Sequence, residues 1–304
     1  MRSDRPPLDR LAVLAGRSWR EVPLPGGLTN TNLRVTTEDR LDPALDLVVR
    51  CSHAGSELLG IDRDAERANT EAAATAGVGP AVVEHRRDLG MLVIEYVDAT
   101  ALSDGSFTDA GVLARAAHAV RRLHEGPRFL GDFDMFTRQA TYLATIRERG
   151  FSLPDGYESY AEAWDRVRRA LAAAPRPTVP CNNDLLAANF LDDGKRIWLI
   201  DYEYSGNNDA CFELGNTVAE CGFTAEQTEA WVEAYFREPR PGDLARVRLQ
   251  SLCSSYGWSL WGFIQAAASP IEFDFWGWGL ERFERARQLF GGADFEALLT
   301  EAAA

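Results

Sequence analysis

One segment in the second half of the chain holds the residue types best suited to chemistry. Asp184 is followed five positions later by Asn189, and an apolar stretch then ends at Asp201, with Glu203 two positions on. A carboxylate can orient a hydroxyl and accept its proton, whereas amide and carboxylate oxygens are the ligands that a hard cation such as Mg²⁺ prefers. Taken singly, these could be ordinary turn and strand-end residues. Their combined spacing favours phosphoryl transfer, with Asp184 as base and the other three at magnesium.

A glycine-rich turn near the start of the chain could hold phosphate groups. Gly26 and Gly27 lie between two predicted strands and are followed by Thr29, Asn30 and Asn32. Glycines let backbone amides approach an anion closely, and small polar side chains add hydrogen-bond donors. Paired glycines also occur in ordinary hairpins, so the turn alone does not decide between the two interpretations.

Arg50 lies in a predicted strand, where a cation needs a partner. Glu66, on the next predicted helix, is available for this role. Such a pair positions the α- and β-phosphates of ATP in kinases, where the cation is usually a lysine. The alternative is a surface salt bridge.

The last third of the chain is rich in aromatic residues. Trp258 and Trp261 are three positions apart and share one face of a predicted helix. Phe275 and Trp278 follow soon after, and the span 258–278 holds four tryptophans. A core stripe is one interpretation. The other is a site for a quaternary ammonium group, which is attracted to the faces of electron-rich rings.

The order of the predicted elements indicates an α+β protein with two lobes. Strands are predicted within 20–36 and at 47–51, 91–96 and 197–200, with helices at 61–76 and 157–174 and a loop at 181–189. Thr224 and Gln227 form a capping box for a later helix. We expect a small strand-rich lobe at 1–97, a larger helical lobe at 98–304, and a ligand site between them.

Composition narrows the partners. The 304 residues carry a formal net charge of −14, which disfavours binding to nucleic acid and suits a cationic small molecule. No apolar stretch is long enough to span a bilayer, and the first ten residues lack a signal-peptide core. The five cysteines show no metal-ligand spacing. We therefore expect a cytoplasmic protein that binds no nucleic acid, does not insert into a membrane, and is a monomer or homodimer.

Several short motifs together resemble the choline/ethanolamine kinase family, which belongs to the aminoglycoside-phosphotransferase-like branch of the protein-kinase-like fold. The resemblance runs from about residue 26 to residue 285. The motifs are Gly-Gly-Leu-Thr-Asn at 26–30, Asn-Asp-Leu at 183–185, Leu-Ile-Asp-Tyr-Glu-Tyr-Ser-Gly at 199–206, Phe-Glu-Leu-Gly-Asn at 212–216 and Trp-Ser-Leu-Trp-Gly-Phe-Ile-Gln at 258–265.

The resemblance implies a kinase that uses ATP and Mg²⁺ to phosphorylate the hydroxyl of choline or ethanolamine. In this interpretation Asp184 is the base, Asn189 and Asp201 hold magnesium, and Arg50 with Glu66 serves the phosphates. The backbone near Glu95 to Val97 holds the adenine. The substrate site draws on the following residues, of which Glu220 offsets the substrate charge: Tyr204, Glu220, Trp258, Trp261, Phe275 and Trp278.

Two departures from the family pattern bear on function. The family histidine two positions before the base is Asn182 here, which we interpret as a structural replacement. Late tyrosines of the family pocket are Phe275 and Trp278 here, which keeps the rings and removes hydroxyls. The alternatives are a phosphotransferase for an aminoglycoside or another amino alcohol, and a non-catalytic choline-binding homologue.

Overall fold

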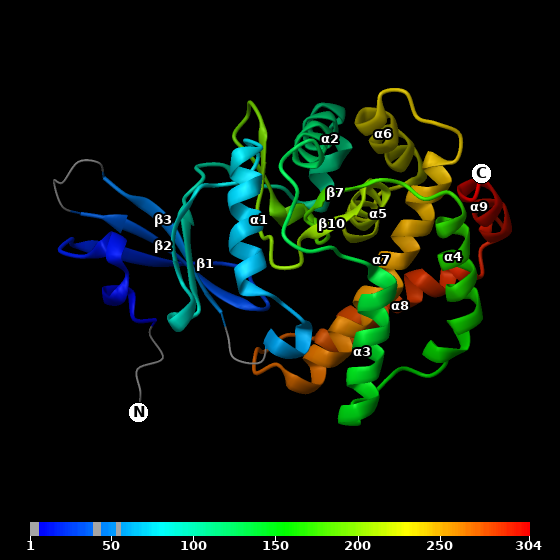
Figure 1. Cartoon of the computed structure of the whole chain (residues 1–304), viewed down its shortest axis with the longest axis horizontal. Coiled ribbons are helices and arrows are strands. Elements are labelled where there is room, and N and C mark those ends of the chain that lie inside the picture. The colour runs from blue at the N-terminus through cyan, green and yellow to red at the C-terminus, as the bar shows by residue number, and fades with distance from the viewer. Residues whose placement is uncertain (1–5, 39–43, 53–55) are drawn as a thin grey trace.

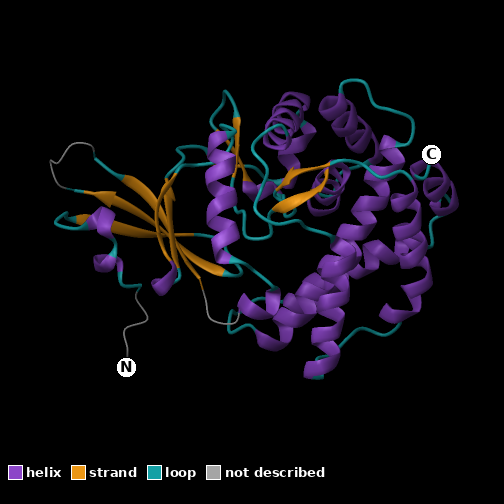
Figure 2. Ribbon diagram, in the orientation of Figure 1, coloured by secondary structure: helices purple, strands orange, loops and turns teal. Residues whose placement is uncertain are grey.

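The computed structural model describes residues 6–38, 44–52 and 56–304. A twisted sheet lies at one end of the molecule and a larger group of helices at the other, with α1 (Arg63–Thr75) between them (Figures 1 and 2). The α+β class expected from the sequence is confirmed. The chain leaves the sheet after Glu95, close to the predicted boundary, and the division into lobes at residue 97 stays a prediction.

The sheet is antiparallel with the strand order β1-β2-β3-β5-β4. Buried side chains alternate along part of β2 and β3, whereas β5 has four consecutive buried residues, and Val35, Val49 and Val93 are fully buried. The strands predicted within 20–36 and at 47–51 and 91–96 are therefore present. Their bounds are β1 (Trp19–Leu24), β2 (Asn30–Thr37), β3 (Asp46–Ser52), β4 (Val82–Arg86) and β5 (Met91–Glu95).

Helix α1 begins at a side-chain cap, because the Asp62 carboxylate accepts hydrogen bonds from the backbone N–H groups of Asp64 and Ala65. Its buried face carries Glu66 and Asn69. Asn69 bonds to Ser205 and Leu130 of the helical part, so α1 joins the sheet to the rest of the molecule.

The remaining helices build the larger part of the molecule. The capping box of Thr224 and Gln227 is formed at the start of α6, as predicted. The 26-residue α7 runs through the centre, and its residues 247–265 are almost all buried. The bounds are α2 (Ala110–His124), α3 (Met135–Arg149), α4 (Ala161–Ala173), α5 (Ala210–Glu220), α6 (Ala225–Phe236), α7 (Asp243–Ala268), α8 (Phe275–Phe290) and α9 (Phe295–Ala302).

Two small sheets frame the segment that carries the predicted chemistry. One pairs β7 (Thr178–Cys181) with β10 (Gly206–Asp209), and the other has the order β6-β8-β9. Strand β7 was not predicted from the sequence, where Pro175, Pro177 and Pro180 indicate the end of the preceding helix. Pro180 is tolerated because β7 pairs with a single neighbour. The second sheet comprises β6 (Thr100–Ala101), β8 (Phe190–Asp192) and β9 (Ile197–Leu199).

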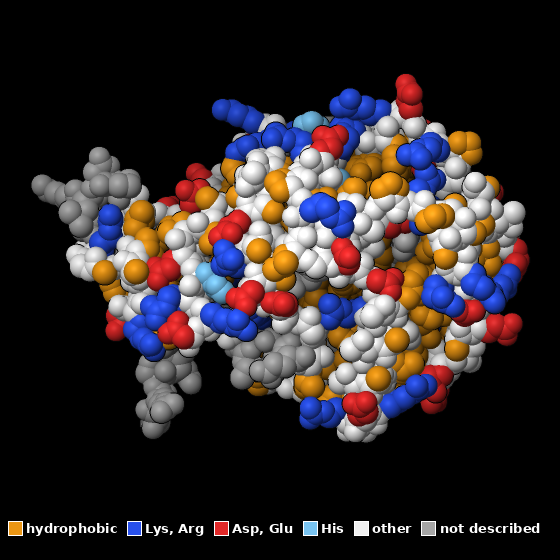
Figure 3. All heavy atoms as spheres, viewed as in Figure 1, with side chains coloured by type: hydrophobic (Ala, Val, Ile, Leu, Met, Phe, Trp, Pro, Cys, Tyr) orange, Lys and Arg blue, Asp and Glu red, His pale blue; other side chains and the backbone are white. Residues whose placement is uncertain are grey.

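The described part of the chain has no helix that is both long and apolar enough to cross a bilayer. Basic and acidic side chains are interspersed on the face shown in Figure 3. All five cysteines are buried and unbridged.

Glycines set the distances between the helices that carry the site. A Cβ at Gly215 of α5 would lie 2.5 Å from the backbone N of Ser251 in α7. A Cβ at Gly262 of α7 would lie 2.8 Å from the Cα of Gly279 in α8. The backbones of α5, α7 and α8 are thus in direct contact, which brings side chains from all three helices to one place.

We predict that Gly215→Ala destabilises the protein. In an ordinary helix this change is stabilising by about 1 kcal/mol, but here the added methyl group meets backbone that cannot move aside. The free energy of unfolding should fall by roughly 2 kcal/mol or more, as for other overpacked cores. Chemical denaturation measures it.

Gly291→Ala is the control, since its Cβ would make an ordinary contact at 3.4 Å and Gly291 has a negative φ. A Gly215→Ala protein as stable as wild type would show that the α5–α7 contact is looser than described.

Candidate active site

The loop that carries Asp184 is held by hydrogen bonds to a buried carboxylate. Glu213 of α5 accepts hydrogen bonds from the backbone N–H groups of Asn182 at 2.9 Å and Asn183 at 2.6 Å. Asn183 has a φ of 68°, a left-handed conformation that needs such support. Burial raises the pKa of Glu213 to about 7, although its two backbone hydrogen bonds act in the opposite direction. The sequence analysis did not single out Glu213.

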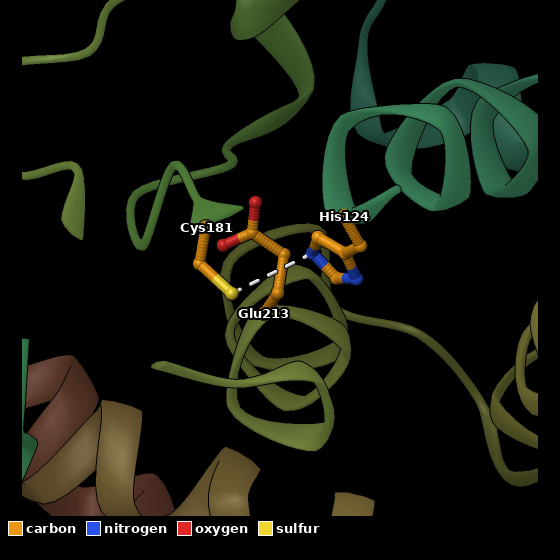
Figure 4. Close-up of side chains that lie close together, drawn as sticks. All are labelled: His124, Cys181 and Glu213. Carbon is orange, nitrogen blue, oxygen red and sulfur yellow. Dashed lines mark hydrogen bonds between the residues drawn. The ribbon is translucent and has the colours of Figure 1, made fainter. Parts of the chain in front are cut away.

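Glu213 of α5 belongs to a buried group with His124, at the end of α2, and Cys181, at the end of β7 (Figure 4). The ligand atoms of the three side chains lie within 4.8 Å of one another. Nδ1 of His124 is 2.7 Å from the Tyr235 hydroxyl, and Nε2 is 3.6 Å from the Cys181 sulfur. Because both nitrogens and both Glu213 oxygens already have protein partners, we interpret this group as support for the loop and not as a metal site.

Asn182 ties the loop to the segment after β9. Its side-chain amide donates to the backbone oxygens of Ile200 at 3.1 Å and Asp201 at 2.8 Å, and its Oδ1 accepts from the backbone N–H of Asp184. Asp201 itself has a left-handed φ of 66°. This geometry agrees with the structural role predicted for Asn182, since its side-chain amide bonds to the backbone of both Asp184 and Asp201.

Asp184 and Asn189 face the same cavity. Asn189 donates from its amide nitrogen to the backbone oxygen of Asp184 at 2.8 Å, which leaves its Oδ1 available. Burial raises the pKa of the Asp184 carboxyl well above its ordinary value, and the carboxylates of Glu220 and Asp201 add to the effect.

Two arginines and three carboxylates form a compact cluster beside this loop. Arg50 contacts Asp201 at 2.6 Å and Glu66 at 3.2 Å, so the predicted pair with Glu66 is present. Arg63, which the sequence analysis did not consider, contacts Glu66 at 2.7 Å and Glu203 at 3.3 Å. Burial alone would lower the pKa of Arg50, but Asp201 and Glu66 outweigh it and raise that pKa.

Glu203 connects this cluster to the glycine-rich turn. Its two oxygens accept hydrogen bonds from Thr29 Oγ1 at 2.8 Å and Asn30 Nδ2 at 2.9 Å. The backbone of the turn requires glycine at two positions, because φ is 88° at Gly26 and 94° at Gly27. Burial raises the pKa of Glu203 to about 7, with Asp201 as the next cause.

The donor set fits a hard cation. Carboxylate oxygens of Glu66, Asp201 and Glu203 lie within 4.8 Å of one another, and Asn189 lines the cavity beside Asp201. Both oxygens of Glu203 are engaged by the turn, and Glu66 is engaged by the arginines. Asp201 is also held by Arg50, but its side chain is the most exposed of the three carboxylates. Asp201 and Asn189 are therefore the more open candidate ligands, and Glu203 also serves as the anchor of the turn.

Two cavities meet at Asn32 and Arg50. The first, of about 290 Å³, is lined by Glu95 and Val97. Their role in holding adenine stays a prediction. The second, of about 230 Å³, is bounded by the glycine-rich turn, the loop residues and an aromatic wall. It includes the following predicted site residues: Gly26, Gly27, Thr29, Asn32, Arg50, Asp184, Asn189, Asp201, Glu203, Tyr204, Trp258, Trp261 and Trp278.

The aromatic wall of the second cavity is a connected set of rings. Trp261 donates from Nε1 to the Tyr204 hydroxyl at 2.7 Å, and Tyr204 meets Trp258 edge-on at 4.8 Å between ring centroids. Trp278 lies 5.0 Å from Trp261. Phe275 packs against Trp261 at 5.7 Å between ring centroids and does not line the cavity, and its contact with substrate stays a prediction.

Glu220 also lies outside the cavity lining. Its carboxylate is held by both Nε and Nη2 of Arg282, and both side chains are buried. The carbon of the Arg282 guanidinium is 3.2 Å from the ring centroid of Trp278. Glu220 is therefore paired within the protein, and its role in offsetting a substrate charge stays a prediction. No sequence motif indicated Arg282.

The comparisons with known proteins agree with this geometry. The model of the phosphotransferase enzyme family matches residues 21–249. A choline/ethanolamine kinase family protein from Mesorhizobium loti is 35% identical in sequence, with a TM-score of 0.84 over 97% of this chain and 96% of that one. This chain belongs to the choline/ethanolamine kinase family of phosphotransferases.

More distant relatives of this kinase family extend over most of the chain. A probable ethanolamine kinase from Arabidopsis thaliana is 24% identical over 298 residues, which covers 86% of this chain and 77% of that protein. A choline kinase from Streptococcus pneumoniae is 22% identical, with a TM-score of 0.77 over 93% of this chain and 97% of that one. The protein-kinase-like fold expected from the sequence is confirmed by these structural neighbours.

We predict that Glu213 makes the stability of this kinase-family protein depend on pH. The carboxyl ionises near 4.5 when exposed and near 7 in the fold. Between these values the folded chain binds a proton that the unfolded chain has released. The free energy of unfolding should thus fall as the pH rises through this window, by up to roughly 3 kcal/mol from this group.

Glu213→Gln removes this titration. The difference in unfolding free energy between wild type and variant should therefore narrow from about pH 5 to about pH 8. Glu229→Gln, at an exposed position of α6, is the control. A difference for Glu213→Gln that is constant or widens with pH would contradict the account of the buried carboxyl.

Proposed function

We propose that this protein transfers the γ-phosphoryl group of ATP to the hydroxyl of choline, with ethanolamine as the alternative acceptor. The observation that carries the proposal is the position of Asp184. It lies where the cavity with the aromatic wall meets the glycine-rich turn and the carboxylate cluster. A hydroxyl placed beside Asp184 would thus have phosphate-binding groups on one side and rings on the other.

The residues on the nucleotide side have the chemistry that ATP requires. The backbone from Glu95 to Val97 lies in the first cavity, where an adenine would fit between β5 and the second lobe. The glycine-rich turn presents backbone N–H groups, and Arg50 supplies the cation for the phosphates. Asn189 and Asp201, with Glu203 beside them, would hold Mg²⁺. When bound, that ion neutralises phosphate charge that develops during transfer.

Asp184 would orient the acceptor hydroxyl and take its proton as the oxygen attacks phosphorus. Its raised pKa brings the carboxylate closer to the basicity that proton transfer near neutral pH requires. The backbone N–H of Asp184 donates to Asn182 Oδ1, and the Asn189 amide donates to the backbone oxygen of Asp184; together they fix where the carboxylate lies.

The aromatic wall favours choline as the acceptor. A trimethylammonium group has no N–H to donate and is attracted by ring faces such as those of Tyr204, Trp258 and Trp261. A primary ammonium needs acceptors for its three N–H groups and loses free energy when rings strip its water. An aminoglycoside has several ammonium groups and would need several carboxylates, for which this wall of rings is a poor match.

The direct test is an acceptor panel. Purified protein with ATP and Mg²⁺ is given choline, ethanolamine or an aminoglycoside, and the release of ADP is followed. We expect release to depend on an amino alcohol and to be fastest with choline. Release that is equal with and without acceptors would contradict the proposal, and a response only to the aminoglycoside would support the other phosphotransferase class.

We predict that Asp184→Ala lowers turnover on choline by roughly a hundredfold or more, which is the usual scale for a positioned base. Steady-state kinetics measure it. Asp165→Ala, a partly exposed carboxylate on α4 that lies outside the cavity lining, is the matched control and should leave turnover unchanged. Near-normal turnover of the Asp184 variant would show that another group accepts the proton.

We predict that Trp261→Ala raises the KM for choline by roughly tenfold, because one well-placed ring contributes about 1.4 kcal/mol to binding a quaternary ammonium. The KM for ATP should change little, since the ring lies on the acceptor side. Trp198→Ala, on β9 and outside this cavity, controls for general loss of a tryptophan. An unchanged KM for choline would mean that Trp261 is core packing only.

A further inference from the structure

The Glu220–Arg282 pair lies directly behind the aromatic wall. Arg282 of α8 donates to both oxygens of Glu220 at the end of α5, and the exposed fractions of the two side chains are only 7% and 2%. A buried pair with this forked geometry is strong, and removal of either partner leaves a buried charge without compensation.

Arg282 also touches the wall itself. Its guanidinium lies over the Trp278 ring at 3.2 Å, and its Nη1 donates to the backbone oxygen of Trp278 at 3.4 Å. A cation on one face of a ring draws on the electron density that would attract a second cation. Trp278 is therefore a weaker site for a substrate ammonium than Tyr204, Trp258 or Trp261.

Glu220 is one contact removed from the acceptor site, because the Arg282 guanidinium that holds its carboxylate lies over Trp278 of the cavity wall. Besides burial, the charge of Glu220 also contributes to the raised pKa of Asp184, which lines the cavity. Without Arg282, the acceptor side would have two carboxylates without a cationic partner, Asp184 and Glu220. With Arg282 in place, Glu220 is neutralised and its oxygens are occupied.

We propose that Arg282 is a positioning residue that sets the choice of amine. By occupying the Glu220 carboxylate and one ring of the wall, it denies a primary ammonium the extra acceptor that this group needs. A methylated ammonium, which uses ring faces and no acceptor, loses little. The inference rests on the proposed function and adds to it a determinant that lies outside the cavity lining.

The test compares kcat/KM for choline and for ethanolamine in wild type and three variants. In Arg282→Met, Glu220 is freed, and the preference for choline over ethanolamine should fall by about tenfold, the size expected of one gained hydrogen bond to a charged group. Arg282→Lys, which keeps the charge, should retain most of the preference. Arg287→Met, an exposed position on the same helix, is the control and should not change it.

Variants of Glu220 keep the test decisive if Arg282→Met does not fold. Glu220→Gln leaves Arg282 as an unpaired cation beside the cavity, which should raise the KM of both amines. Adding Arg282→Met to Glu220→Gln removes that cation, so both KM values should return toward wild type. If Glu220 bound the amines directly, the double variant would stay as weak as Glu220→Gln.

The outcomes separate this inference from the proposed function. If wild type phosphorylates neither amine, the proposed function fails. If it phosphorylates both, and neither the preference in Arg282→Met nor the KM values in the double variant move as expected, the role of Arg282 is overturned while the kinase assignment stands.

Discussion

Two arginines and three carboxylates meet where the sheet faces the helical half, and most of the site depends on their balance. Arg50 comes from β3, Arg63 and Glu66 from α1, and Asp201 and Glu203 from the segment after β9. Charges buried this deeply are stable only when paired and hydrogen-bonded. Since the partners come from three separate stretches of chain, the cluster forms only when the sheet, α1 and the helical half are in place together.

The same cluster connects the parts of the site that must cooperate. Glu203 holds the glycine-rich turn through Thr29 and Asn30, and Asn182 holds the backbone of Asp201. Arg50 is shared between Glu66 and Asp201, so a phosphate that approaches Arg50 competes for the same N–H groups. In the proposed function, phosphate binding at Arg50 and cation binding at Asp201 would thereby be coupled through one guanidinium.

The sequence was most informative where function imposes spacing along one segment. Asp184, Asn189 and Asp201 lie within 18 positions and were found from their types and order. The Arg50–Glu66 pair was also accessible, because its members lie on successive elements. The family resemblance supported the placement of Tyr204, Trp258, Trp261 and Trp278, which do line one cavity.

The remaining features depend on packing between distant elements, which spacing does not reveal. Arg282 and Glu220 are 62 positions apart, and Glu213 reaches the loop from α5 across 30. Glu213 and Arg282 have residue types that occur on many helices, so neither was singled out from the sequence. Strand β7 was not predicted, because a proline such as Pro180 argues against a strand that has a neighbour on each side. The family resemblance placed Phe275 in the substrate site, but the ring packs against Trp261 outside the cavity lining.

The central claim is that the site moves a phosphoryl group onto the hydroxyl of a small amino alcohol. Phosphorus NMR of a reaction with purified protein, ATP, Mg²⁺ and choline tests it most directly, because it identifies the product and not only the loss of ATP. The account predicts a new phosphomonoester signal that coincides with added phosphocholine and grows in step with ADP. Inorganic phosphate in place of that signal, or ADP without any phosphorylated amine, would contradict it.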